Sequence, residues 1–311
     1  MKNLWSDTES DKFKDDLELR VYTSRLLGKD PSLVLHGGGN TSVKITETNL
    51  IGMNEEILYV KGSGWDLVSI EREGFSPVRM AHMLNLSKLK SLSDPQMVNE
   101  LKTQLTNATS PTPSVETILH AILPFKYVDH THADAVVTIS NTSNGEERIR
   151  EIYGNRVVIV PYVMPGFDLA KEVGRLFSEM ASDETEGIVL LNHGIFSFGS
   201  TARKSYDRMI DLVNLAEQYL VSQNAWDNEE PLTNVKSKKI RNDVSQLRQK
   251  ISSVAGNPVL LNLTNSQLGT SFSNRNDVET IATRGPLTPD HVIRTKRIPM
   301  IGRDVEKYVK E

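Results

Sequence analysis

Residues 127–139, YVDHTHADAVVTI, contain a pair of histidines inside a run of strand-forming residues. Aromatic and β-branched side chains favour the extended conformation, so the whole stretch is predicted to form a strand. Residues two positions apart in a strand project from the same face. His130 and His132 can therefore bring both imidazoles to one metal ion.

A third histidine, His193, follows the apolar run GIVLLN within a second predicted strand over 187–199. Three histidines with a nearby carboxylate are typical of catalytic zinc sites that keep one position open for substrate. A His-x-His pair is also consistent with strand side chains that are satisfied by hydrogen bonds, and His193 favours the metal interpretation. Because neutral imidazole binds several metals, the sequence predicts zinc or another divalent transition metal.

The composition excludes several other kinds of protein. The chain has 311 residues, a formal net charge of −4 and no cysteine. The charge and the lack of a long basic run argue against a nucleic-acid-binding surface, and disulfides and thiolate ligands are excluded. No apolar run is long enough to cross a membrane, and the acidic N-terminus is unlike a signal peptide. We therefore expect a cytoplasmic protein that binds neither nucleic acid nor membrane.

A predicted helix supplies the carboxylate. Thr112 is its expected N-cap, and Pro113 stands at the first helical position. Glu116 then borders the apolar face, where a partly buried carboxylate beside a metal is a candidate acid–base group. The alternative role for Glu116 is an exposed acid that the helix dipole favours. His120, on the same side of this helix, is expected to be structural.

Three places in the sequence offer backbone N–H groups to an anion. The glycines at 37–39 precede Asn40 but do not form a dinucleotide fingerprint, because a strand follows them rather than a helix. The loop 61–64, KGSG, adds a cation, and Ser114 lies in the first turn of the predicted helix. Each could be an ordinary turn, but together they indicate a phosphate pocket beside the metal.

The chain is expected to contain one catalytic domain and an extension. Strands and helices are mixed up to residue 222, which predicts an α/β domain over 1–222. A polar stretch then begins the extension, 223–311, which is expected to include a helix at about 236–254. The apolar stripe of that helix is expected to dock on its own chain rather than on another subunit.

These motifs together resemble the class II aldolase and adducin N-terminal domain family, over roughly residues 15–222. In this resemblance, His130, His132 and His193 fall on the three zinc ligands. Glu116 falls on the glutamate of a Ser-Ser-Glu segment, which acts as the catalytic acid–base. The positions that the resemblance assigns to substrate phosphate are Gly39, Asn40, Ser63, Gly64 and Ser114.

The resemblance implies an α/β/α layered fold with a central, largely antiparallel sheet, in a homotetramer. The implied reaction is reversible cleavage of a ketose 1-phosphate, such as rhamnulose or fuculose 1-phosphate, to dihydroxyacetone phosphate and an aldehyde through an enediolate. Alternatives are a sugar-phosphate 4-epimerase, another metal-dependent lyase or decarboxylase, and a non-catalytic adducin-like scaffold. Epimerases of the family tend to have aspartate at position 116, so glutamate favours cleavage, and the retained histidines argue against the scaffold.

Two departures from the family pattern follow Ser114. Val115 replaces the second serine of Ser-Ser-Glu and so removes a phosphate donor. The segment from Glu116 to His130 is also shorter than in the fuculose-phosphate enzyme. Such shortening occurs in the branch whose aldolase half is fused to a short-chain dehydrogenase.

The C-terminal stretch 283–296 looks like the inter-domain region of that branch, so the chain is expected to be a free-standing aldolase half. The stretch contains an Arg-Gly-Pro motif at 284–286. Its basic side chains are expected either to approach the active site and contact an anionic substrate, or to be solvated. These residues are Arg284, His291, Arg294 and Lys296.

Overall fold

The computed structural model describes residues 1–226, 241–264 and 266–310. The chain divides into two compact units. The first unit comprises Met1–Trp226 and Leu287–Arg294, and the second comprises Asp227–Pro286 and Thr295–Glu311. All the site residues predicted above lie in the first unit, so its architecture decides how they are placed.

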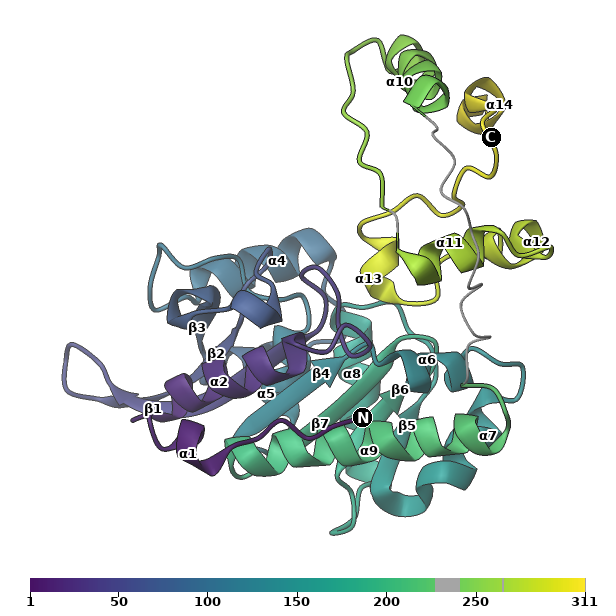
Figure 1. The fold of residues 1–311 in the computed structure, drawn as a ribbon. Helices are drawn as coiled ribbons and strands as arrows, with labels where there is room; N and C mark the ends of the chain where they lie inside the picture. Colours follow the sequence, from purple (N-terminus) through teal and green to yellow (C-terminus); the bar gives the residue numbers. More distant parts are fainter. Residues whose placement is uncertain (227–240, 265, 311) are drawn as a thin grey trace. The chain divides into compact units, whose positions relative to one another are not determined.

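A seven-stranded sheet with the order β3-β2-β1-β4-β7-β6-β5 forms the centre of the first unit (Figure 1). Every neighbouring pair is antiparallel except β5 and β6, which confirms the expected largely antiparallel sheet. The strands are β1 (Asn40–Thr48), β2 (Asn54–Lys61), β3 (Phe75–Arg79), β4 (Tyr127–Thr131), β5 (Val157–Val160), β6 (Gly187–Leu190) and β7 (Gly194–Gly199).

Helices cover both faces of this sheet and bury an apolar cluster on each, which confirms the α/β/α layers (Figure 1). The helices on one face are α2 (Asp16–Gly28), α6 (Asp134–Ser140), α7 (Gly145–Tyr153) and α9 (Ala202–Ser222). Those on the other are α3 (Met80–Leu86), α4 (Asp94–Thr103), α5 (Thr117–Ile122) and α8 (Phe167–Met180). The short elements are α1 (Asp7–Ser10), η1 (Leu67–Ser69), η2 (Arg72–Gly74), η3 (Gly154–Arg156) and α13 (Pro289–Val292).

The second unit is helical in its described part. Its helices are α10 (Arg241–Ala255), α11 (Gln267–Ser273), α12 (Val278–Ala282) and α14 (Val305–Lys310). Helix α10 accounts for most of the helix expected at about 236–254, while 236–240 lie outside the described residues. An ion pair of 2.8 Å joins Arg303 to Asp243. Across the described ranges, no helix has the length and apolarity needed to span a membrane.

The predicted strand over 127–139 is wrong beyond Thr131, because the chain turns there into helix α6. Ala135, Val136 and Ile139 recur at helical spacing and pack into the apolar cluster beneath α9. Burial of this face outweighs the β-propensity of the local sequence. His132 consequently lies just past the end of β4 rather than within a strand.

The predicted helix start at Thr112 and Pro113 is also wrong. Pro113 bridges to Gly62, and the Thr112 carbonyl accepts a 2.8 Å hydrogen bond from the Ser63 amide. Helix α5 begins only at Thr117. Because the segment before α5 pairs with the loop after β2, two of the turns expected to bind phosphate are brought side by side.

The predicted single strand over 187–199 is a hairpin of β6 and β7. Its turn contains Asn192 in the left-handed region, with φ of 59°. Asparagine tolerates this conformation better than most residues do. The reversal places His193 in the turn, directly before β7.

Candidate metal centre

Strand β4 carries His130 into the middle of the sheet, between β1 and β7. The His130 side chain is fully buried and stacks on Phe196, with ring centroids 4.1 Å apart. Its Nδ1 lies 3.1 Å from the Ile195 carbonyl. Since a carbonyl only accepts, Nδ1 carries the proton, and Nε2 of the neutral ring is left with a lone pair.

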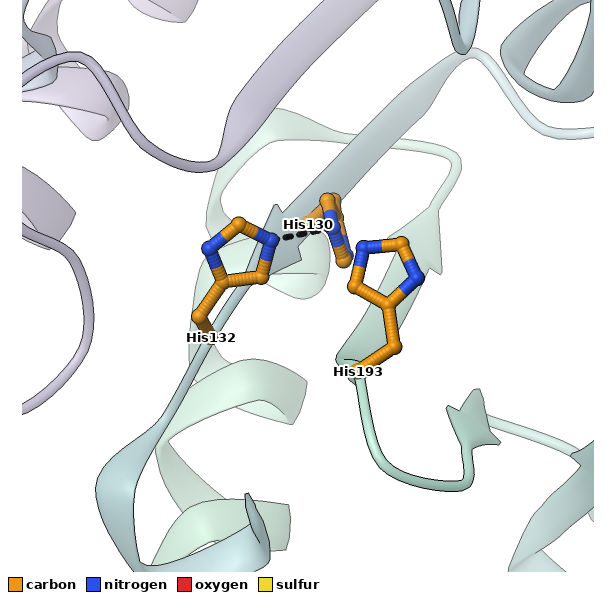
Figure 2. A group of neighbouring side chains, drawn as sticks. All are labelled: His130, His132 and His193. Carbon is orange, nitrogen blue, oxygen red and sulfur yellow. Dashed lines mark hydrogen bonds between the residues drawn. The ribbon is translucent and has the colours of Figure 1, made fainter. Parts of the chain in front are cut away.

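The β6–β7 turn brings His193 to the end of β4 (Figure 2). Thr131 pairs with Ile195, so the turn before β7 lies against the last residues of β4. Gly194 makes this approach possible, because a Cβ there would lie 2.4 Å from the Thr131 carbonyl oxygen. The close approach of two backbones therefore sets the position of His193.

The three rings converge on one point, as Figure 2 shows. The Nε2 atoms of His130 and His132 are 3.1 Å apart. One nitrogen from each of His130, His132 and His193 lies within 4.8 Å of the others, and all three residues are buried. We call these residues the histidine trio.

The hydrogen bonds of the histidine trio fit a cation. His132 Nδ1 donates a 2.6 Å hydrogen bond to Asp290 Oδ1, as His130 Nδ1 does to its carbonyl. In the neutral tautomers that these hydrogen bonds select, the Nε2 lone pairs of His130 and His132 face each other across 3.1 Å, an arrangement that a metal between them stabilises. Burial lowers the pKa of His130 well below 6.5 and that of His193 to about 4, so the rings of His130 and His193 are neutral.

Glu116 borders the histidine trio from the start of α5. Its Oε2 lies 3.5 Å from His130 Nε2, and its Oε1 lies 3.6 Å from His193 Nε2. Among the described residues, Glu116 Oε1 and His193 Nδ1 are buried atoms without a hydrogen-bond partner. A buried, unsatisfied carboxylate oxygen directed at imidazole nitrogens again fits a bound cation.

Asn40, at the start of β1, fixes the Glu116 carboxylate. Its Nδ2 donates hydrogen bonds of 2.6 Å to Glu116 Oε2 and 3.1 Å to Ser114 Oγ. Burial of Glu116 raises its pKa. The neighbouring His130 and His193 and the Asn40 amide together lower the pKa by more than this, so that the net value is about 2. The Glu116 side chain, expected to be partly buried, is only 5% exposed.

His120 orients Asn40 and is not part of the histidine trio. Its Nε2 bonds to Asn40 Oδ1, and its Nδ1 lies 2.8 Å from Ser42 Oγ. Burial lowers the pKa of His120 to about 3, so the ring is neutral and Nε2–H donates to the Asn40 oxygen. This contact turns the Asn40 amide nitrogen toward Glu116.

The predicted phosphate residues form a second group around this centre. Asn40 and Ser114 are hydrogen-bonded to each other and to Glu116, whereas Ser63 and Gly64 are exposed. The loop containing Ser63 and Gly64 is joined to Ser114 by the Ser114 amide, which donates to the Lys61 carbonyl at 3.2 Å. The structure therefore places the exposed Ser63 and Gly64 next to the partly buried Ser114, which bonds to the buried Asn40.

Gly39 and Lys61 complete this group. Gly39 has φ of 57°, and a Cβ there would lie 2.7 Å from the His130 carbonyl oxygen, so the turn packs against β4. Lys61 is 4% exposed, and its Nζ donates to the Gly37 carbonyl at 2.8 Å. Burial lowers the pKa of Lys61 to about 8.

Asp290 is the site residue that sequence reasoning missed. Its side chain is 3% exposed and contacts His132 across 158 residues of sequence. In the sequence it is an acid in the first turn of α13, after the N-cap Thr288, which is a common helix-start pattern. The tail prediction concerned its basic neighbours, whereas the residue that reaches the histidine trio is acidic.

Two family models match the chain. Residues 18–220 match the class II aldolase and adducin N-terminal domain, and residues 238–310 match the second domain of class II aldolases. The first match contains the whole histidine trio and Glu116. Asp290 lies within the second match.

A Bacillus subtilis protein, described as the uncharacterized oxidoreductase YuxG, is 33% identical over 314 residues, which make up 96% of this chain and 44% of that protein. The chain thus spans less than half the length of this relative. The N-terminal class II aldolase domain of a conserved Thermoplasma acidophilum protein is 46% identical, with a TM-score of 0.65, covering 71% of this chain and 99% of that one.

A sugar-phosphate aldolase from Thermotoga maritima shares the fold, with a TM-score of 0.50 and 15% identity over 68% of this chain and 97% of that one. At this identity the likeness shows the fold alone. The family match rests instead on the model that covers residues 18–220, with the close Thermoplasma structure beside it. The chain belongs to the class II aldolase and adducin N-terminal domain family.

Proposed function

We propose that this protein is a metal-dependent aldolase that cleaves a ketose 1-phosphate, of the rhamnulose- or fuculose-phosphate kind, to dihydroxyacetone phosphate and an aldehyde. The observation that carries the proposal is the convergence of the three trio nitrogens beside the Glu116 carboxylate. Membership of a lyase-type enzyme family supports it. Zinc is the proposed metal, because three imidazoles with one open position suit it.

The histidine trio would hold the metal through Nε2 of His130, His132 and His193. The metal, when bound, supplies Lewis-acid chemistry at the substrate carbonyl, where negative charge develops as the carbon–carbon bond breaks. Glu116 Oε1, which accepts no hydrogen bond among the described residues, is the oxygen that moves the proton at the carbon beside that carbonyl. Asn40 keeps the other carboxylate oxygen in place.

The substrate phosphate is proposed to bind where the loop after β2 meets the segment before α5. Donors there are the exposed Ser63 and Gly64, together with Ser114 and Asn40, and Lys61 supplies a positive charge. Gly39 shapes the turn that carries Asn40. Holding the phosphate fixes the distance from its carbon chain to the histidine trio, which is how binding energy contributes to rate. The homotetramer stays a prediction, which light scattering tests.

The test measures dihydroxyacetone phosphate release from rhamnulose 1-phosphate and fuculose 1-phosphate by the zinc-loaded full chain. We expect release that a chelator abolishes and zinc restores. Glu116→Gln should keep zinc but lower kcat by about 10²–10⁴-fold, the usual contribution of an acid–base group. Glu179→Gln, an exposed glutamate on α8, is the matched control and should leave kcat unchanged.

Two results would contradict the proposal. Bound zinc without release from either sugar phosphate would indicate an epimerase or a lyase with another substrate. The exposed Val115, which replaces a phosphate donor of the family pattern, would favour the other substrate. Absence of metal binding would indicate a scaffold.

A further inference from the structure

The segment Leu287–Arg294 belongs to the first unit although both of its flanks in sequence belong to the second. Hydrogen bonds at both of its ends and in its middle attach it. Asn141 Nδ2 donates to the Leu287 carbonyl at 3.2 Å, and Arg294 Nε donates to the His36 carbonyl at 2.9 Å. Between them, Asp290 turns inward to the histidine trio. We call Leu287–Arg294 the returning segment.

Asp290 is held by two donors at once. Oδ2 accepts a 2.8 Å hydrogen bond from the Leu35 amide, and Oδ1 accepts a 2.6 Å hydrogen bond from His132 Nδ1. The carboxylate lies over Gly38, where a Cβ would come within 1.6 Å of Oδ1. Glycine at position 38 thus leaves the space that the carboxylate fills.

These contacts determine which nitrogen of His132 faces His130. With Nδ1–H bonded to Asp290, the neutral tautomer of His132 has its lone pair on Nε2, which lies 3.1 Å from His130 Nε2. A carboxylate on the far nitrogen of a metal-binding histidine fixes its tautomer and ring orientation and makes the ligand more basic. We propose that Asp290 is a positioning residue of the metal centre, so that the returning segment completes a site whose ligands all lie in the first family domain. This rests on the proposed metal-dependent function.

The count of acceptors makes the proposal testable by the near-isosteric change Asp290→Asn. The amide that this change introduces has one acceptor oxygen in place of two, while the Leu35 N–H and His132 Nδ1–H both need an acceptor. The backbone N–H cannot move its proton, whereas the imidazole can change tautomer. In the variant the amide NH₂ therefore faces His132 Nδ1, and the proton moves to Nε2, which removes the lone pair for the metal.

The experiment measures the zinc dissociation constant of the full chain by competition with a chromophoric chelator. Asp290→Asn should weaken zinc binding by about 10–100-fold, the usual effect of losing such a partner. Asp290→Ala should weaken it no more than Asp290→Asn does, whereas a merely space-filling role predicts that the near-isosteric asparagine is the milder change. Asp211→Asn, at an exposed aspartate of α9, is the matched control: it removes the same charge away from the histidine trio, and the dissociation constant should change by less than about twofold.

A second measurement needs no metal. In the metal-free chain labelled with ¹⁵N-histidine, at pH 8, the nitrogen shifts of His132 should show Nδ1–H in the unaltered protein and Nε2–H in Asp290→Asn. Unchanged zinc affinity and tautomer in Asp290→Asn would overturn the positioning role and leave the metal-dependent lyase standing. If the tautomer changes in Asp290→Asn but the unaltered chain binds no zinc, the metal function is refuted, and with it the proposed completion of the site.

Discussion

The histidine trio and the returning segment meet at one centre, but different interactions place them. His130 is in a central strand, and His193 follows from the turn of a neighbouring hairpin, so sheet register positions both. Asp290 is placed by a contact with His132 across 158 residues, on a short helix outside the sheet. The His130 and His132 pair could thus be recognised from local spacing, whereas the contact of Asp290 with His132 depends on tertiary packing.

The two regions also differ in how firmly they are anchored. The strand that carries His130 is held by a fully buried ion pair of 2.5 Å between Arg20 and Asp129, and Ser205 Oγ donates to the same carboxylate. The returning segment is held at its end by the exposed Arg294, through one hydrogen bond to a carbonyl. The first region is part of the core, so we expect a change at the exposed end of the second to cost the fold less stability.

The largest expected effect tests the histidine trio itself. His132→Ala removes a proposed ligand, and lyase activity should fall by at least about a thousandfold, since Lewis-acid stabilisation contributes several kcal/mol. His82→Ala, a histidine that bonds to Glu100 outside the trio, is the matched control and should keep full activity. Steady-state kinetics of the zinc-loaded variants measures both. A His132→Ala variant with undiminished activity would refute the mechanism.

The next effect tests the difference in anchoring. Arg20→Ala leaves Asp129 charged and buried without its partner, and it should lower the free energy of unfolding by about 3–5 kcal/mol. Arg294→Ala removes an exposed contact and should lower it by about 0.5 kcal/mol or less. Equilibrium unfolding in urea gives both values. Equal losses in the two variants would show that the regions are not anchored differently.

A smaller effect tests the packing of Asp290, in the returning segment, against Gly38. Gly38 lacks a positive φ, so alanine is allowed by the backbone, but its Cβ would overlap Asp290 Oδ1. Gly38→Ala should therefore displace Asp290 and weaken zinc binding by about 10–100-fold, like loss of the carboxylate itself. In an Asp290→Ala background, Gly38→Ala should weaken zinc binding by less than about twofold, because the effects of substitutions at contacting residues do not add. Equal effects in both backgrounds would mean that Gly38 acts independently of Asp290.

The smallest effect concerns Lys61, which bonds to the Gly37 carbonyl, beside the Arg294 side chain. Burial lowers the pKa of Lys61 to about 8, so the ammonium is lost as the pH rises through this value. If Lys61 attracts the substrate phosphate, KM should rise about tenfold above pH 8, the worth of one charged hydrogen bond. Lys61→Gln lacks the charge throughout, so its KM should be independent of pH and equal to the raised KM of the unaltered chain above pH 8. A KM that stays constant in the unaltered chain from pH 7 to 9 would remove Lys61 from the phosphate site.

Local sequence patterns predicted a mixed α/β domain, because strand and helix signals are local. The resemblance to a family predicted the layered architecture and the mostly antiparallel sheet, and both are confirmed. Residues 133–139 were mistaken for strand because β-branched side chains favour extended structure, whereas burial beneath α9 selects a helix. The helix start before Glu116 was placed too early because Pro113 is used instead in a bridge to Gly62.

In the candidate site, too, the sequence predicted some residues, while others could be recognised only in the folded structure. Spacing predicted that His130 and His132 lie together, and the apolar run before His193 and the resemblance to a family added the third histidine. The structure brings all three together. The resemblance to a family suggested the role of Glu116, whose contact with Asn40 depends on the pairing of β1 with β4. Nothing in the sequence near Asp290 marks it as a partner of His132, because the contact exists only once the chain has folded back.

The most direct test of this account is the zinc stoichiometry of the full chain, measured by equilibrium dialysis and metal analysis. Convergence of three imidazole nitrogens predicts one zinc ion per chain, and the variant with all three trio histidines replaced by alanine should bind none. An unaltered chain without zinc, or a triple variant that binds it with undiminished affinity, would contradict the central claim.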